Sequence, residues 1–130
     1  MKIIECVPNF SEGQDHIIIK EIADSMEAIP GVTLLDVDSG ADTNRTVITI
    51  VGNPDAVISS AFSGIAAATK LINMNKHTGA HPRMGSTDVC PFVPVSNVTM
   101  DDCVNYSNRL AKMVGDKLKI PIFLYEYSAL

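Results

Sequence analysis

The sequence predicts an α+β fold, a ferredoxin-like βαββαβ plait extended by a further helix and strand. Three observations support this fold class. β-prone runs and helical stripes alternate in the order that the plait requires. Turn-forming residues join the second and third β-prone runs, and proline or glycine punctuates the ends of the helical stretches.

The first strand is expected over Lys2–Val7, a β-prone run that Pro8-Asn9 ends. Residues 11–15 then open a helix, and Pro30-Gly31 closes it. The apolar positions of this helix share one stripe, which predicts that this face is buried. They are Ile18, Ile22 and Met26.

A second strand is expected over Val32–Val37 and a third over Arg45–Val51, because the intervening Asp38–Asn44 is dense in turn formers. Asn53-Pro54 supplies an N-cap followed by proline at the first helical position, so the second helix begins there and runs to about residue 73. Its many Ala, Ser and Gly residues permit a close approach to a sheet.

The fourth strand is expected over Val89–Val95, which completes the plait. Thr99–Asp102 fits a capping box and starts the additional helix, whose last turn carries Lys117. A last strand is expected over Ile120–Tyr125.

Length and composition indicate one domain over residues 1–130. The formal net charge of -5 argues against nucleic acid or an anionic membrane as a partner. The N-terminal apolar run is broken too early for a signal peptide, and we expect no apolar run of transmembrane length. Three cysteines, Cys6, Cys90 and Cys103, then indicate reduced thiols in a cytoplasmic protein.

The charge is uneven along the chain. No acidic residue lies between Asp55 and Asp88, whereas five basic residues do. They are Lys70, Lys76, His77, His81 and Arg83. This basic island favours a small anionic ligand, but a buried, Ala-rich helix that has no room for carboxylates explains it equally well.

The plait places three polar loops at one end of the sheet, because its strands and helices alternate in direction. These loops cover residues 9–15, 38–44 and 75–88, and we expect them to form one candidate site. The third loop contains His81 and Arg83. His81 suits proton transfer near pH 7, and Arg83 suits binding of a carboxylate. A surface histidine and a structural Arg83–Asp88 ion pair remain open alternatives.

Four residues of the other two loops complete the candidate set: Asn9, Ser11, Asp38 and Asn44. Asp38 would orient His81, or cap its turn. The other three would hydrogen-bond a heteroaromatic ligand, or only shape their turns. A metal site of His77, His81 and Cys90 is disfavoured because Gly79 and Pro82 argue against a helix there, and burial disfavours Cys90 as a nucleophile.

Several segments together resemble the formiminotransferase family. They are Glu5–Gly13, Leu34–Asp38, Asn44–Val47, Gly79–Gly85 (Gly-Ala-His-Pro-Arg-Met-Gly) and Asp88–Val95. The resemblance implies transfer of a formimino group from N-formimino-L-glutamate to N5 of tetrahydrofolate, a step of histidine degradation. Tetrahydrofolate would be a co-substrate, and no metal is implied.

The resemblance also assigns roles to residues. His81 matches the family's general base, while Arg83 and Asp38 match positions that stabilise the adduct and orient the base. Asn9, Ser11, Asn44 and Gly79 would contact the substrate or the pterin.

The family's transferase unit has two similar subdomains with folate between them, and this chain resembles only the N-terminal one. We therefore expect that this chain either forms a homodimer or pairs with a separate C-terminal subdomain. The alternative is a non-catalytic folate-binding or regulatory subdomain.

Overall fold

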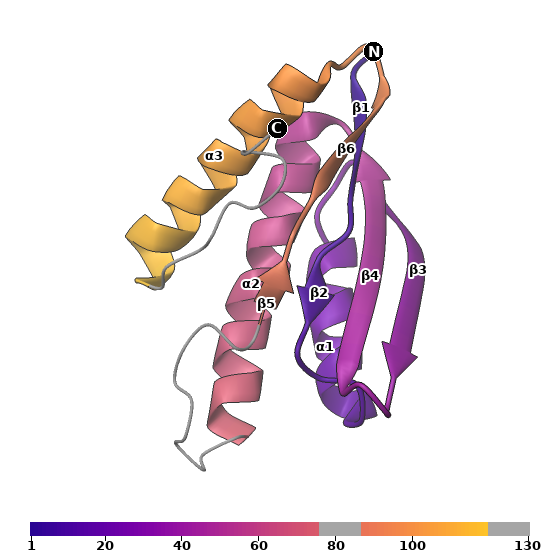
Figure 1. Cartoon of the computed structure of the whole chain (residues 1–130), viewed down its shortest axis with the longest axis vertical. Coiled ribbons are helices and arrows are strands. Elements are labelled where there is room, and N and C mark those ends of the chain that lie inside the picture. Colours follow the sequence, from indigo (N-terminus) through magenta and orange to yellow (C-terminus); the bar gives the residue numbers. More distant parts are fainter. Residues whose placement is uncertain (76–86, 120–130) are drawn as a thin grey trace.

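The computed structural model describes residues 1–75 and 87–119 of the chain. Over those residues it has six strands and three helices (Figure 1). In chain order they are β1 (Ile3–Cys6), β2 (Asn9–Phe10), α1 (His16–Glu27), β3 (Val32–Gly40), β4 (Arg45–Gly52), α2 (Pro54–Asn75), β5 (Thr87–Val89), β6 (Phe92–Ser96) and α3 (Met100–Leu118).

The strands form one antiparallel sheet in the order β5-β2-β4-β1-β6, with β3 on the outer side of β4. β1 and β2 together make the first strand of the plait, and β5 and β6 together make the fourth. The spatial order is therefore the second, third, first and fourth strands, which confirms the ferredoxin-like prediction. The expected last strand, 120–125, lies outside the described residues.

The first and fourth strands of the plait each consist of two segments separated by a short break. The first stops at Cys6, resumes at Asn9 and thus continues past Pro8, where its end was expected. The fourth has the same break at Cys90 and Pro91. Proline has no N–H to donate to a ladder. The carbonyls still pair, because Pro8 O accepts from Ile48 N at 3.1 Å and Pro91 O accepts from Val7 N at 3.1 Å.

β3 is longer than predicted and contains residues that were assigned to the turn. It continues through Asp38 and Ser39 to Gly40, each paired with β4, so the prediction that the strand ends at Val37 is wrong. Pairing with the central strand overrides the local turn preference of these residues. The turn itself is only residues 41–44.

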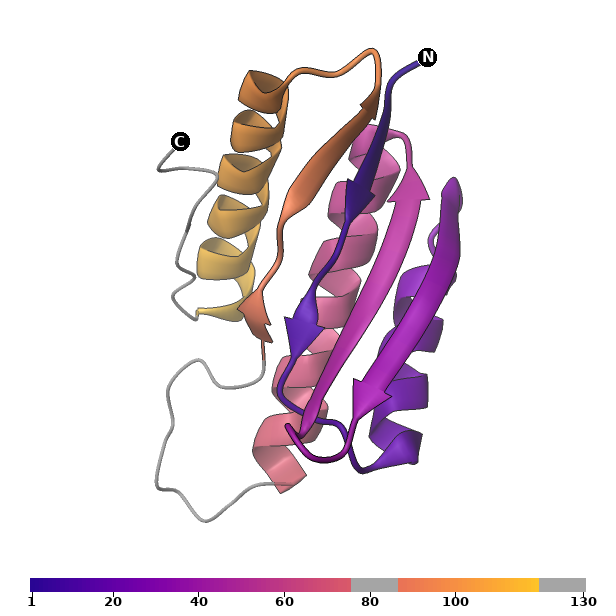
Figure 2. The same ribbon diagram turned by 45° about the vertical axis from the view of Figure 1, so that its right-hand side comes forward.

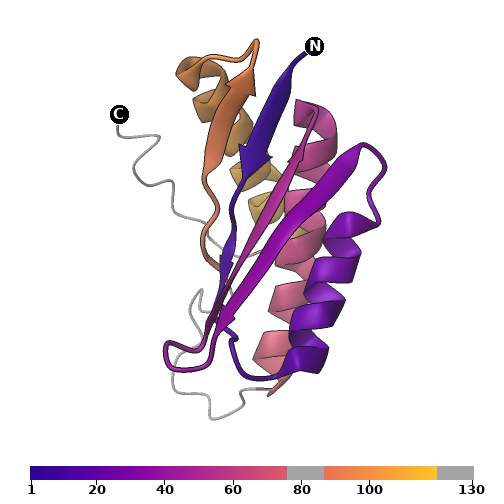
Figure 3. The ribbon, with the colours of Figure 1, turned by 90° about the vertical axis from the view of Figure 1, so that its right-hand side faces the viewer.

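The three helices of the described residues lie on one face of the sheet, and over residues 1–75 and 87–119 no helix lies on the opposite face, which we call the uncovered face (Figures 2 and 3). Side chains alternate along each strand, so one set points toward the helices and is buried. This set forms a single core with the inner faces of the helices. Its strand members include Ile4, Cys6, Phe10, Ile48, Ile50 and Phe92, all 0% exposed.

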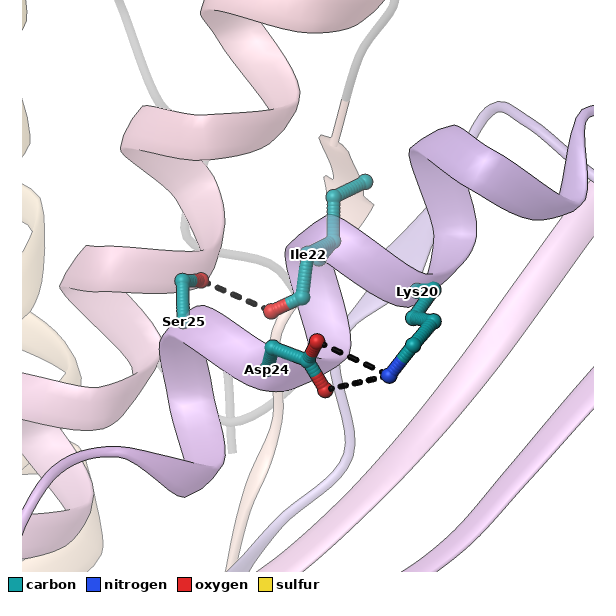
Figure 4. A network of polar contacts seen from close by, with 4 residues as sticks. All are labelled: Lys20, Ile22, Asp24 and Ser25. Atoms are coloured by element: carbon teal, nitrogen blue, oxygen red, sulfur yellow. Dashed lines mark hydrogen bonds and ion pairs between the residues drawn. The ribbon is translucent and has the colours of Figure 1, made fainter.

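Small residues of α2 allow α1 to approach closely. A Cβ on Gly64 would lie 2.6 Å from Met26 Sδ, and Ser60 Oγ donates to Met26 O at 2.8 Å. Ser25 Oγ on α1 donates to Ile22 O at 2.7 Å, as Figure 4 shows. The Ala, Ser and Gly content of α2 therefore serves packing against a helix as well as against the sheet.

The outer face of α1 carries an ion pair between Lys20 and Asp24, one turn apart (Figure 4). Their side chains are 75% and 58% exposed, so solvent screens the attraction. Such a pair contributes about 0.3–0.5 kcal/mol. The position of α1 is therefore fixed by its buried face.

α2 is more apolar than the sequence analysis expected. Residues Pro54–Ile72 have a mean hydropathy of 1.2 and are long enough to cross a membrane by length and composition, so the expectation of no such run was wrong. Of that span, 44% is buried inside the protein. The central packing of α2, between α1 and α3 and against the sheet, accounts for its apolar character.

α3 is the predicted additional helix, and its capping box is confirmed. Thr99 Oγ1 accepts from Asp102 N at 3.0 Å, and an Asp102 carboxylate oxygen accepts from Thr99 N at 3.0 Å. The backbone N–H of Thr99 lowers the pKa of Asp102 by stabilising its charged form. The helix ends at Leu118, before Lys119 in a left-handed conformation.

Candidate functional site

Two of the three polar loops are joined at one end of the sheet. Gly13 N donates to Asn44 Oδ1 at 2.9 Å, and Gln14 Nε2 donates to Ala41 O at 3.2 Å. The segment before α1 is thereby fixed to the β3–β4 turn, as the plait predicts. The third loop lies mostly outside the described residues, but α2 and β5, which flank it, reach the same end (Figure 2).

Gly13 is required at the point where the two loops meet. A Cβ built there would lie 2.3 Å from Gly40 O, 2.5 Å from Arg45 N and 2.9 Å from Arg45 O. All three are backbone atoms, which cannot rotate away as a side chain can. The absence of a side chain at Gly13 therefore sets how closely the first loop approaches the turn.

Glu12 and Thr46 form the buried part of the same contact. Glu12 is 5% exposed, and its Oε2 accepts from Gln14 N at 3.1 Å and Asp15 N at 3.0 Å. The hydroxyl of Thr46, which is 1% exposed, donates to the backbone carbonyl of Glu12. Glu12 thus binds its own loop through its carboxylate and binds β4 through its backbone carbonyl.

The β3–β4 turn is closed by its own residues. Asn44 has φ = 52°, in the left-handed region that Asn tolerates better than most residues. Its N–H donates to Ala41 O at 3.2 Å, and Thr43 Oγ1 donates to Gly40 O at 3.3 Å. The side-chain oxygen of Asn44 is held by Gly13, and its amide nitrogen, Nδ2, takes no part in that bond.

Asn9 and Asp38 are brought together on the uncovered face of the sheet. Both are register partners of Val47 in β4, one from β2 and the other from β3. Thr46 and Ile48 point into the core, so Val47 and its two partners point to the opposite side. The two strand spacings place Asn9 and Asp38 about 10 Å apart across Val47.

Asp38 is exposed and Asn9 is half-buried. Asn9 Nδ2 donates to Val7 O at 3.1 Å, which fixes the direction of its side chain. Ser11 follows Phe10 and is half-buried at the start of the first loop. Asp38 lies two residues inside the end of β3, and its backbone is set by the strand. The alternative interpretation, in which Asp38 caps the turn, does not fit this position within the strand.

The uncovered face carries further carboxylates. Asp36 pairs with Thr49, and Glu5 pairs with Val51 and Val93, on the same side as Asp38. Between them lie the half-buried side chains of Val47, Thr49 and Val51. The face combines an apolar strip along β4 with acidic groups on both sides.

Three predicted site residues, His81, Arg83 and Gly79, lie outside the described residues, as does His77 of the metal alternative. In residues 1–75 and 87–119 there is no group of three or more His, Cys, Asp or Glu side chains that would hold a metal ion. The described part of the site consists of Asn9, Ser11, Asp38 and Asn44, with the contacts that fix them.

Three residues that hold the site in place were not predicted from the sequence: Glu12, Gly13 and Thr46. Gly13 had a visible signal, as a glycine two residues before Asp15, the N-cap of α1. The buried carboxylate of Glu12 and the buried hydroxyl of Thr46 had none, because their partners are distant in sequence or are backbone atoms.

Comparison with known proteins identifies the family. Residues 3–130 match the family model of the formiminotransferase domain, N-terminal subdomain. This chain belongs to the formiminotransferase family. The match covers almost the whole chain, so the resemblance carried by the Glu5–Gly13 and Gly79–Gly85 segments is confirmed.

The relatives of this formiminotransferase chain are longer proteins. A formimidoyltransferase-cyclodeaminase of Dictyostelium discoideum is 55% identical over 96% of this chain and 23% of its own length. Glutamate formimidoyltransferases of Streptococcus pyogenes serotype M1 and Thermoplasma acidophilum are 50% and 43% identical over 98% and 99% of this chain, and 43% of each relative is covered. The chain thus spans less than half the length of these relatives.

Proposed function

We propose that this formiminotransferase chain transfers a formimino group from N-formimino-L-glutamate to N5 of tetrahydrofolate, as a cytoplasmic step of histidine degradation. The observation that supports it most is the similarity to glutamate formimidoyltransferases along nearly the full chain. The uncovered face beside Asn9 and Asp38 supports it independently, because it offers a surface next to the ends of the polar loops.

The proposed reaction needs one proton to move between two nitrogens. N5 of tetrahydrofolate attacks the formimino carbon, and a tetrahedral adduct forms as the N5–C bond is made. The bond from that carbon to the glutamate nitrogen then breaks. His81 takes the proton from N5 and returns it to the leaving glutamate nitrogen, a role that suits a group titrating near pH 7.

Two further residues would assist His81. Arg83 would stabilise the adduct, and Asp38 would orient the histidine by accepting its ring N–H. The exposure of Asp38 on the uncovered face, next to the end of the sheet where the third loop begins, supports this assignment.

The described residues fit tetrahydrofolate as a co-substrate. A pterin ring is flat and has hydrogen-bond donors and acceptors along its edge. The carboxamide of Asn9 would both donate to and accept from that edge, and the neighbouring Val47 offers an apolar surface. Ser11, Asn44 through its Nδ2, and Gly79 would complete the contacts with the substrates.

The test compares the parent chain with His81→Ala and His16→Ala in a formimino-transfer assay. Tetrahydrofolate and formiminoglutamate are supplied to the chain alone and to the chain mixed with the C-terminal part of the Streptococcus pyogenes relative. We expect His81→Ala to lower the rate by about 10²–10⁴-fold, the usual contribution of a general base. His16 is exposed at the start of α1, so its replacement is the matched histidine control.

Equal rates for the parent and His81→Ala would overturn the role of His81. Binding of tetrahydrofolate without transfer, even with the C-terminal part present, would favour the alternative of a non-catalytic folate-binding or regulatory subunit. If the mixture neither binds tetrahydrofolate nor transfers the formimino group, the proposal as a whole is refuted.

A further inference from the structure

Two cysteines that are distant in sequence lie side by side in the sheet. The Sγ atoms of Cys6 and Cys90 are 3.4 Å apart and share a hydrogen bond. Cys6 is the last residue of β1, and Cys90 occupies the break between β5 and β6. The neighbouring backbone is fixed by the bond from Val7 N to Pro91 O, so the two side chains meet across adjacent, paired strands.

The two thiols differ in access to solvent. Cys6 is 0% exposed, whereas Cys90 is half-buried, so the burial that was expected to make Cys90 unreactive is incomplete. Burial raises the pKa of Cys6 well above its ordinary value, and the hydrogen bond and charge of Cys90 add to this effect. Cys90 is therefore the thiol that a small reagent reaches first, and Cys6 is the neighbour that can respond.

A third cysteine provides an internal comparison. Cys103 is buried in the first turns of α3, and burial also raises its pKa. In the described part of the chain, the sulfur of Cys103 makes no hydrogen bond with Cys6 or Cys90, whose sulfurs bond to each other.

We propose that Cys6 and Cys90 are a reversible oxidation site that closes to a disulfide with a low-molecular-weight disulfide as the oxidant. The thiolate of Cys90 attacks the small disulfide, forms a mixed disulfide and releases one small thiol. Cys6 then loses its proton, attacks the Cys90 sulfur and releases the second small thiol. The protein loses two electrons, and the small disulfide gains them.

The bond would cost little rearrangement and would strengthen the fold. The sulfurs have to move about 1.4 Å closer to reach the length of a disulfide. The crosslink closes a loop from residue 6 to residue 90, and a loop of that length removes much of the freedom of the unfolded chain. We expect the thermal midpoint of the oxidised chain to rise by roughly 10 °C.

The experiment treats the folded chain with oxidised glutathione and then counts free thiols. We expect the parent to fall from three free thiols to one, with full recovery after reduction. Trypsin leaves Cys90 and Cys103 in one peptide, between Arg83 and Arg109, so the bond is assigned in a Cys103→Ala variant. That variant should lose both remaining thiols, and mapping without reductant should show Cys6 joined to Cys90.

A Cys90→Ser variant provides the matched negative control. It keeps the other two cysteines and a small polar side chain at a half-buried position, so its fold should persist. We expect it to form no internal disulfide and to show no rise of the thermal midpoint.

Each remaining outcome overturns the proposal. These are three thiols that stay free in the folded parent, a bond that includes Cys103, a covalent dimer, or a Cys6–Cys90 bond that forms only in urea. The readouts do not depend on formimino transfer, so the proposal stands or falls separately from the proposed function.

Discussion

Replacing Gly13 by alanine should separate the loop before α1 from the β3–β4 turn. The new Cβ would lie 2.3 Å from Gly40 O, and about 1 Å of backbone movement is needed to reach an ordinary contact. Overpacking of this kind costs about 1–3 kcal/mol. The movement also weakens the bond from Gly13 N to Asn44 Oδ1, worth about 0.5–1.5 kcal/mol. We therefore expect a loss of about 2–4 kcal/mol in the free energy of unfolding.

Urea unfolding of Gly13→Ala beside Gly115→Ala tests this magnitude. Gly115 lies inside α3, where an added Cβ meets nothing within 4 Å, so alanine there should raise stability by about 0.5–1 kcal/mol. With a urea dependence of about 2 kcal/mol per molar, the Gly13→Ala midpoint should fall by roughly 1–2 M. A Gly13→Ala chain within 0.5 kcal/mol of the parent would refute the close approach of the two loops.

Three further predictions concern single groups. Burial raises the pKa of Cys6 above its ordinary 9.0, so the thiol proton is lost at a lower pH in the unfolded chain than in the folded one. The free energy of unfolding should therefore fall above about pH 9, by up to about 1.4 kcal/mol per pH unit. Urea unfolding from pH 8 to 10 should show a smaller decline in Cys6→Ala. Thr46→Val leaves the Glu12 carbonyl without its hydroxyl donor and should cost about 1–2 kcal/mol in urea unfolding, whereas an unchanged midpoint would contradict that bond. Thr99→Ala removes the cap of α3 and should lower the free energy of unfolding by about 1 kcal/mol, which a lower thermal midpoint would show. Equal melting curves for the parent and the variant would disprove this.

Much of the fold could be predicted because its signals are local. The start of α2 follows from Asn53-Pro54, and Asn53 Oδ1 accepts from Ala56 N at 3.0 Å as an N-cap should. The capping box at Thr99 depends only on residues three apart. The meeting of two loops at one end follows from strand order alone, since each reversal of the chain has a fixed direction in the plait.

The errors occurred where partners distant in sequence decide the structure. Asp38 and Ser39 favour a turn locally, but pairing with β4 keeps them in a strand. Likewise, Pro8 was expected to end the first strand, but the ladder continues past it, whereas the fourth strand was expected to be continuous and is broken at Pro91. The contact of Cys6 with Cys90 also could not be predicted, because it requires the register of the first and fourth strands.

The position of β4 between β3 and the first strand also sets an order for folding. The β3–β4 hairpin closes over a short turn, whereas pairing Phe10 with Thr46, or Cys6 with Phe92, requires long stretches of chain to come together first. Local pairings form faster because less chain entropy is lost before they do. We therefore expect the hairpin to form early and the surface shared by Asn9, Val47 and Asp38 to appear late. A chain that stalls between those stages would keep its hairpin and lack its site.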